Sequence, residues 1–545
     1  MTSTPDAADA GEVSLVPDAA DPGEVSLVPD LAPVVVPAVA PEADLALVPD
    51  PTGPTDLASR LAAAFRTGTD LDLADAEVDA GLIAALLVRP PDHPVAAPGE
   101  GLESARVPAL RLTRAHVVGA LDLAFAEVTA PVVLTGCRFD AQPVLTGACT
   151  RSLTLDGCTL PGLAARLVQV RGDLRLTGCT VTGTTSLENA EISGSLNLSA
   201  SRLQVPGGRA LSAGGMTVGG GVVGRRGLVV DGEARLVGAK ISGGVLLHGA
   251  TLSRPGGTAL CLDEITTNRV ELSDGFTCTG QLLMRSATIT GRLSFFRARL
   301  IGAAVNGSSA PGSVGNKQVR ALRARGMTAG EMELRPAQVE GLVDLSQAHV
   351  GALRDSEATW PAHLRLDGFT YDHLLGADPA PSVAARCRWL AREQETYRPQ
   401  PYEQLAEYYR RLGHDADARR VLLAKERRRR ATRPVPQRLG GWLLDALVGY
   451  GYRSELAAIW LAVLVVVGSL VFSAHHPRVI DPEHTPHFSP VVYAIDLLIP
   501  IGAFGLRTAY DPVGWTAWVA DALIAAGWIL ATALVAGVSR RVGRD

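Results

Sequence analysis

Small and aliphatic side chains alternate regularly between about residues 110 and 375. A small residue, any residue and an aliphatic residue form a recurring triplet. The triplets are Ala115-His116-Val117, Ala126-Glu127-Val128, Cys137-Arg138-Phe139, Cys158-Thr159-Leu160, Cys179-Thr180-Val181, Ala190-Glu191-Ile192 and Ser201-Arg202-Leu203. Leu-x-Leu pairs such as Leu153/Leu155 lie between them, so the steps alternate between five and six residues. A full coil of 21–22 residues predicts a stacked repeat architecture.

A longer period overlies the first one. Four triplets, which begin at Ser201, Ala250, Ala298 and Ala348, are 49, 48 and 50 residues apart. The first two run into Pro-Gly-Gly, at residues 206–208 and 255–257. We interpret this as one repeat family in which each block of 48–50 residues carries a loop excursion.

The triplet has a simple physical meaning in a square coil of short strands. One aliphatic residue per side points inward, and the residue two positions earlier also points inward but lies at a corner, where only a small side chain fits. The next coil places the same residue types about 4.8 Å away. Cys137, Cys158 and Cys179, spaced 21 residues apart, are therefore predicted to form a column of small interior residues.

This pattern resembles that of pentapeptide-repeat proteins, whose unit reads A-(D/N)-L-x-x. The second position here is Arg, Thr, Glu or His, and six-residue steps intrude. The resemblance covers residues 101–375, about half of the chain. It implies a mainly β fold, namely a quadrilateral, right-handed parallel β-helix. Proteins of this appearance are bacterial and are sometimes labelled membrane-associated oxidoreductases.

The segments before the repeats differ from them in composition. Residues 1–55 hold ten acidic residues, no Lys or Arg, and a near-tandem GEVSLVPD at Gly11–Asp18 and Gly23–Asp30. Such a segment buries too little apolar surface to fold, so we predict a disordered acidic leader, and it lacks the features of a secretory signal. Residues 56–100 begin with a helical apolar pattern and are predicted to form a short cap over the first coil.

A helical pattern returns after the repeats, at residues 381–432. Tyr402–Tyr409, Gly413 and Ala418 resemble a single tetratricopeptide hairpin. One hairpin is too few for a helical solenoid of its own. We therefore predict an α-helical connector to the C-terminal region.

Residues 440–545 are predicted to form a transmembrane helical hairpin. Residues 456–474 are a run of 19 uncharged residues, and residues 515–539 are a second candidate span. Basic residues flank the outer ends, at Lys425–Arg430 and Arg540–Arg544. This distribution predicts a multi-pass protein of the cell membrane with both termini in the cytoplasm. The seven cysteines are then expected to be reduced.

The segment between the two candidate spans, residues 490–506, is apolar but broken by Asp496, Pro500 and glycines. It is predicted to be a re-entrant or interfacial helix. A span, a short helix and a second span form the layout of two-transmembrane channels. However, Ile499–Gly505 lacks the Thr-Val-Gly-Tyr-Gly sequence of a potassium filter.

Two sequence patterns match functional motifs in residue type alone. Gly219-x-Gly221-x-x-Gly224 matches a dinucleotide fingerprint, but Arg225-Arg226-Gly227 follows where a helix is required. The cysteine column is a flat ladder, whereas a metal or cluster site needs converging ligands. We therefore expect no cofactor and no catalytic residue.

Three other groups are candidates for a functional site. A loop rich in histidine is a weak candidate for a divalent metal site, with a solvated polar loop as the alternative. Its histidines are His475, His476, His484 and His487. Asp496, Asp521 and Arg507 are membrane candidates, with an Asp521–Arg507 pair at the interface as the alternative for Asp521. Lipid headgroup contacts are expected from Arg427, Arg428, Arg429 and Arg430.

The net charge of the repeat segment excludes one class of function. Residues 101–375 carry 27 Lys and Arg against 22 Asp and Glu, a balance of 27 − 22 = +5, so the solenoid is not an acidic mimic of DNA. No nucleic acid partner is expected. The leading hypothesis is a membrane-anchored scaffold that binds an unknown cytoplasmic protein, and assembly into a homo-oligomer stays open. A two-span ion channel or transporter-like pore with a regulatory solenoid is the alternative, and a membrane-associated oxidoreductase is the third hypothesis.

Overall fold

The computed structural model describes residues 54–89, 108–304, 319–376, 381–392, 397–432, 434, 454–480, 486–499 and 504–542. The chain divides into two compact units, residues 1–55 and 56–545. Of the predicted acidic leader, only Pro54 and Thr55 at the start of α1 are described. The second unit contains the repeats and the C-terminal helices.

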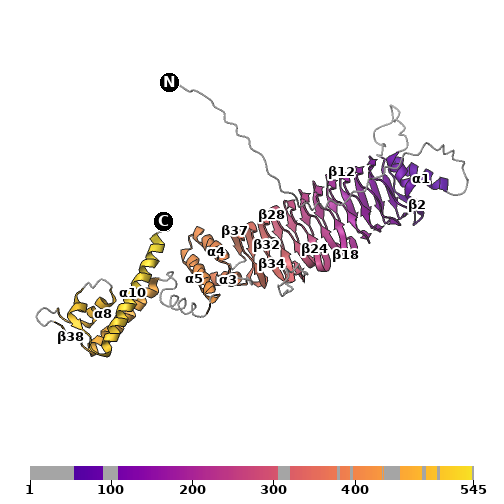
Figure 1. Ribbon diagram of the computed structural model, residues 1–545. Coiled ribbons are helices and arrows are strands. Elements are labelled where there is room, and N and C mark those ends of the chain that lie inside the picture. Colours follow the sequence, from indigo (N-terminus) through magenta and orange to yellow (C-terminus); the bar gives the residue numbers. More distant parts are fainter. Residues whose placement is uncertain are drawn as a thin grey trace, which may run out of the picture. The chain divides into compact units, whose positions relative to one another are not determined.

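The repeats form a parallel β-solenoid of about 12 turns, which confirms the predicted fold class (Figure 1). One coil consists of four short strands, β9 (Leu153–Asp156), β10 (Thr159–Leu160), β11 (Leu163–Ala164) and β12 (Gln169–Val170). Each strand pairs in parallel with its equivalent one coil away, and the strands join into sheets of 20 and 17 strands. Among the described pairings in these two sheets, only β30 (Ala303–Ala304) with β31 (Val319–Arg323) is antiparallel.

The register reproduces the short period of the sequence. Leu110, Val132, Leu153 and Leu174 are partners on successive rungs, at spacings of 22, 21 and 21 residues. The predicted cysteine column is present and almost fully buried. The Cys158 thiol donates to the carbonyl of Leu134 in the coil before it, at 3.3 Å between sulfur and oxygen.

The longer period corresponds to pairs of coils. Arg202, Val229, Thr251, Thr277 and Arg299 are successive partners, so the coils are 27, 22, 26 and 22 residues long. The longer coils contain the Pro-Gly-Gly excursions, within β18 (Arg202–Ser212) and β24 (Thr251–Cys261). The blocks of 49 and 48 residues are therefore each one plain coil and one coil with an excursion. The third predicted block is wrong, because Arg299 pairs with Gln338 while the triplet that begins at Ala348 lies on the other sheet, opposite Thr328.

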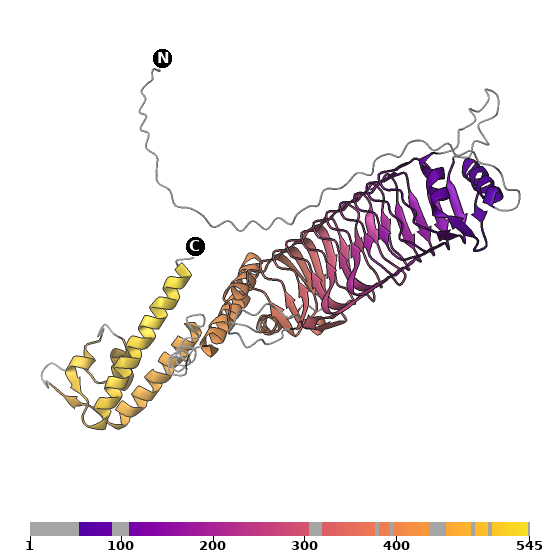
Figure 2. The same cartoon turned by 45° about the vertical axis from the view of Figure 1, so that its right-hand side comes forward.

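Helices cover the first coil of the solenoid (Figure 2). β1 (Leu71–Asp72) and β2 (Glu77–Asp79) form two sides of this coil, and α2 (Ala80–Val88) follows directly. α1 (Pro54–Thr67) contributes Leu61 and Phe65 to the apolar core of the coils. The backbone N–H and C=O groups at this end are thus shielded from pairing with another chain.

The other end of the solenoid is also covered by helices. α3 (Val383–Leu390), α4 (Gln400–Arg411) and α5 (Asp415–Ala431) follow the last strand, β37 (Thr370–Gly376). Their side chains take over backbone bonds that a further coil would have made. The bonds are Gly368 N to Gln400 Oε1 at 3.0 Å, Gln400 Nε2 to Phe369 O at 3.1 Å and Gln404 Nε2 to Tyr371 O at 2.7 Å. The segment expected to act as a connector therefore also packs as a cap.

A buried ion pair fixes α3 to the solenoid. Arg386 on α3 donates two hydrogen bonds to Asp355, at 2.5 and 2.7 Å, and both side chains are at most 2% exposed. Trp360 Nε1 donates a further bond to Asp355 at 2.8 Å. Because a buried charge left without its partner costs about 3–5 kcal/mol, this contact strongly favours the docked helix.

The C-terminal helices form a separate small apolar core. They are α7 (Ser454–Ala474), α8 (Pro490–Leu498), α9 (Leu506–Ala509) and α10 (Trp515–Val542). α7 and α10 each pack against α8 through a glycine. A Cβ at Gly468 would lie 3.0 Å from that of Ala494, and one at Gly527 would lie 2.1 Å from the Leu498 carbonyl oxygen.

The predicted hairpin is supported for one of its two spans. Within the described residues, one helix is long and apolar enough to cross a membrane, at Trp515–Thr532. The apolar part of α7, Ala458–Ala474, is shorter, at 17 residues. α8 ends at Leu498, so the described part of the predicted re-entrant segment begins with a helix of nine residues.

The tight corners of the coils provide a test of this packing. A Cβ at Gly219 would lie 2.3 Å from the carbonyl oxygen of Ser193 one coil away. We predict that Gly219→Ala destabilises the solenoid by about 1–3 kcal/mol because the two coils must separate. Gly214→Ala is the matched control, since its Cβ would meet only the Val237 oxygen at 3.6 Å. Urea unfolding followed by circular dichroism measures both, and equal midpoints for the two variants would contradict the prediction.

Candidate functional site

The outer face of one sheet carries two neighbouring columns of polar residues. The first column consists of partners on four successive rungs. They are Glu271 on β26 (Val270–Glu271), Ser294 on β28 (Thr288–Ser294), Glu333 on β32 (Thr328–Leu334) and Arg354 on β35 (His349–Asp355). The second column lies two residues further along each coil. It consists of His248, Ser273, Phe296 and Arg335. Rungs are about 4.8 Å apart, so these side chains contact one another.

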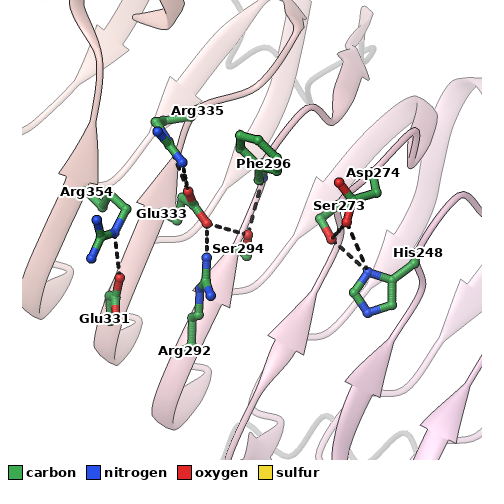
Figure 3. Close-up of polar contacts among 10 residues, drawn as sticks. All are labelled: His248, Ser273, Asp274, Arg292, Ser294, Phe296, Glu331, Glu333, Arg335 and Arg354. Carbon is green, nitrogen blue, oxygen red and sulfur yellow. Dashed lines mark hydrogen bonds and ion pairs between the residues drawn. The ribbon is translucent and has the colours of Figure 1, made fainter. Parts of the chain in front are cut away.

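Glu333 is the centre of a charged network (Figure 3). It points outward, yet its side chain is only 1% exposed, because Arg292 and Arg335 cover its carboxylate from either side. Arg335 Nε donates at 2.9 Å and Ser294 Oγ at 3.0 Å. Burial of the carboxyl opposes ionisation, but the hydrogen bonds from Arg335, Arg292 and Ser294 prevail and lower the pKa of Glu333.

Phe296 lies between two arginines beside this network. The guanidinium carbons of Arg297 and Arg335 are each 4.9 Å from the centre of its ring. Arg292, Phe296, Arg297 and Arg335 together form what we call the aromatic–arginine patch. Arg292 is 45% exposed and Arg335 is 31% exposed, so the patch is open to solvent. Aromatic and arginine side chains are the residues most enriched at binding surfaces.

His248, Ser273 and Asp274 lie together but do not form a catalytic triad. His248 Nδ1 is 2.8 Å from Ser273 Oγ and 3.8 Å from Asp274 Oδ2 (Figure 3). A triad needs the hydroxyl and the carboxylate on opposite ring nitrogens, whereas both lie on the same nitrogen here. Ser273 is also only 3% exposed, so a substrate cannot reach it. The cluster serves to stack one coil on the next.

The Gly219–Gly224 motif lies in the corner of a coil and in β20 (Gly221–Val223). β20 pairs in parallel with the strands before and after it. A helix does not follow, and the glycines are required because neighbouring coils approach closely: a Cβ at Gly224 would lie 2.8 Å from Leu247 in the next coil. The motif therefore has the geometry of a stacking corner and not of a dinucleotide site.

The histidines of the predicted metal loop are partly described. His475 packs edge-on against Trp515 at 5.1 Å between ring centres, and His476 lies 5.4 Å from Phe488. His487 is described as well, but His484 lies outside the described residues. Within the part of the chain that the structure describes, no three His, Cys, Asp or Glu side chains are placed to hold a metal ion.

The three membrane candidates have different surroundings. Asp496 is fully buried and accepts hydrogen bonds from the backbone N–H groups of Phe504 at 3.0 Å and Arg507 at 2.8 Å. It therefore holds the backbone at Phe504 and at the start of α9 close to α8. Asp521 is exposed on α10, and the ion pairs between described residues do not include one with Arg507.

The basic end of α5 is largely solvent-facing. Arg427, Arg428 and Arg429 are exposed and Arg430 is half-buried. Arg429 forms a 3.7 Å pair with Glu426. This arrangement leaves the cluster accessible to an anionic surface.

A comparison with protein-family models, curated proteins and solved structures finds no match to this chain. The geometry alone defines the class, which is a parallel β-solenoid closed by helices at both ends and followed by C-terminal apolar helices. The assignment to the pentapeptide-repeat subtype rests on the sequence resemblance alone. The aromatic–arginine patch is the candidate site that the sequence analysis missed.

The network around Glu333 predicts a pH-dependent contribution to stability. A carboxyl group whose pKa is lower in the folded state than in the unfolded chain stabilises the fold at pH values above its unfolded pKa of about 4.3. This contribution to stability is lost as the pH falls through the folded pKa. We predict that Glu333→Gln lowers the urea midpoint at pH 7 and that the difference from wild type shrinks below about pH 4. Glu331→Gln is the control, because its pair with Arg354 is partly exposed and is worth about 0–1 kcal/mol. A difference between Glu333→Gln and wild type that does not depend on pH would refute the assignment.

Proposed function

We propose that this protein is a membrane-anchored, non-catalytic β-solenoid scaffold that binds a cytoplasmic protein through the aromatic–arginine patch. The patch is the observation that carries the proposal. Two of its arginines, Arg297 and Arg335, flank one aromatic ring. The third, Arg292, pairs with Glu333 and also has Glu271 and Glu331 nearby. An acidic partner surface with an apolar centre is complementary to this arrangement.

Membrane anchoring through two spans belongs to the same proposal. α7 and α10 expose large apolar side chains along much of their length, among them Val466, Leu470 and Trp528. A soluble protein rarely leaves such a surface uncovered. Trp515 and Trp518 at the start of α10 suit one interface, and Arg540–Arg544 at its end suit the cytoplasmic interface. Both termini would then lie in the cytoplasm.

The remaining expectations extend this picture. Arg427–Arg430 would contact anionic lipid headgroups from the cytoplasmic side. The pentapeptide-repeat subtype and a bacterial source are part of the proposal through the sequence resemblance. Assembly into a homo-oligomer would also cover the exposed apolar faces of α7 and α10.

Affinity capture with the full-length protein in detergent tests the partner hypothesis. We predict that wild type retains a specific protein from membrane-free cell extract and that the double variant Phe296→Ala, Arg297→Glu loses it. Arg202→Glu, an exposed arginine on β18, is the matched control and should retain the same protein. Removal of a central aromatic or arginine residue typically costs about 2 kcal/mol or more, which is about 30-fold in affinity. Equal recovery by all three proteins would eliminate the patch as the binding surface.

A two-span channel or transporter-like pore is the second candidate. It is favoured by the packing of the short helix α8 against both α7 and α10 through Gly468 and Gly527. Planar-bilayer recording on the purified full-length protein is the test. If this candidate holds, we expect discrete current steps that Gly527→Leu abolishes, because a larger side chain displaces α8. Silence across ions and voltages would remove the pore and leave the scaffold proposal intact.

A further inference from the structure

The other sheet carries a separate cluster of arginines near the C-terminal end of the solenoid. One column of this cluster consists of partners on four successive rungs. They are Leu283 on β27 (Thr277–Leu283), Arg323 on β31, Asp344 on β34 (Leu342–Asp344) and Arg365 on β36 (His363–Arg365). A second column lies two residues further along each coil and contains Arg285, Arg325, Ser346 and Asp367, the last of which pairs with Arg398 at 3.7 Å. Arg320 lies on the same strand as Arg323, three residues earlier.

The carboxylates beside this cluster are already engaged. Asp263 accepts bonds from the side chain of Arg285 at 2.9 Å and from its backbone N–H at 2.7 Å. Asp344 accepts a bond from Ser346 Oγ at 2.6 Å and one from Arg365 at 3.3 Å. Arg285 and Arg365 are therefore the arginines that these two acids neutralise.

Arg323 lacks such a partner. Its Nε is buried without a hydrogen bond, and among the described residues neither Arg323 nor Arg320 forms an ion pair. Residues 305–318, which precede β31 in the chain, contain no Asp or Glu in their sequence and so supply no carboxylate. Burial, together with the charges of Arg320, Arg285 and Arg325, lowers the pKa of Arg323.

The charges around Arg323 do not balance. Five arginines, namely Arg285, Arg320, Arg323, Arg325 and Arg365, face the three acids Asp263, Glu264 and Asp344, which leaves 5 − 3 = +2. A buried donor without a partner costs about 1–3 kcal/mol, and clustered positive charge adds to that cost. A bound anion would relieve both. Guanidinium groups match the oxygens of phosphate, and a phosphate monoester carries about −1.5 to −2 charge near pH 7.

We propose that Arg323, assisted by Arg320 and Arg325, binds the phosphate group of a phosphorylated ligand on this face of the solenoid. Arg285 and Arg365 keep the two neighbouring acids neutralised, so that these acids do not repel the anion. The site lies on a different sheet from the aromatic–arginine patch and is independent of the proposed partner.

Isothermal titration calorimetry with inorganic phosphate on the full-length protein in detergent tests the site. We expect binding by wild type, at least tenfold weaker binding by Arg323→Met, and unchanged binding by Arg202→Met. Arg320→Met provides a second test if Arg323→Met does not fold. Phosphate should also raise the melting temperature of wild type more than that of either site variant. No binding by wild type, or equal binding by wild type and Arg323→Met, would overturn the proposal.

A second arm of the experiment distinguishes the sources of the phosphate group. The same detergent micelles are doped with phosphatidic acid at a matched phosphate concentration. If inorganic phosphate binds and the lipid adds no effect, the phosphate group comes from a soluble ligand. If only the lipid binds, and its binding depends on Arg323, the phosphate group comes from a lipid headgroup. Competition between the two shows that the site accepts the group from either source. Binding of the lipid that Arg323→Met does not weaken counts against the site.

Discussion

Vertical stacking at a spacing of about 4.8 Å is the constraint on which the whole solenoid depends. Each coil offers its neighbour a row of backbone groups and a row of side chains, so every interior position must match the one below it in size and polarity. The column of Cys137, Cys158 and Cys179 satisfies this condition, and Ser201 continues it with a hydroxyl that donates to the carbonyl of Leu176. Glycine corners meet the same demand where backbone lies on backbone, as at Gly219.

This constraint explains why the fold was predictable from the sequence. Interior positions repeat because stacking requires it, so the spacing of 21 residues between cysteines revealed both the coil length and the column. The spacings of 49 and 48 residues were also read correctly as blocks with an excursion, but their division into two coils was not evident, and the spacing of 50 residues joins triplets on different sheets. The intermediate corner residues, such as Leu228 and Phe276, are large and do not resemble the small residues of the triplet.

The candidate site was much harder to predict. Outward-facing residues do not have to match from coil to coil, so they carry no period. The Glu333 network joins residues up to 41 positions apart across a coil of unusual length, and the sequence does not set that register. The one available signal was local: Phe295-Phe296-Arg297 is the single Phe-Phe pair in the chain and has arginines close on both sides. The cap at α3 was missed similarly, because Asp355 and Arg386 lie on separate elements.

The excursions have a consequence for how such a chain tolerates change in length. Residues 206–208 and 255–257 both branch off after equivalent interior leucines, namely Leu203 and Leu252, which lie in one column with Val230 and Cys278. The strands resume their pairing after each departure, so extra residues at this corner lengthen a surface loop and leave the interior unchanged. One edge of the solenoid thus admits insertions of differing size, and grafted peptides placed there would be displayed without disturbing the rungs.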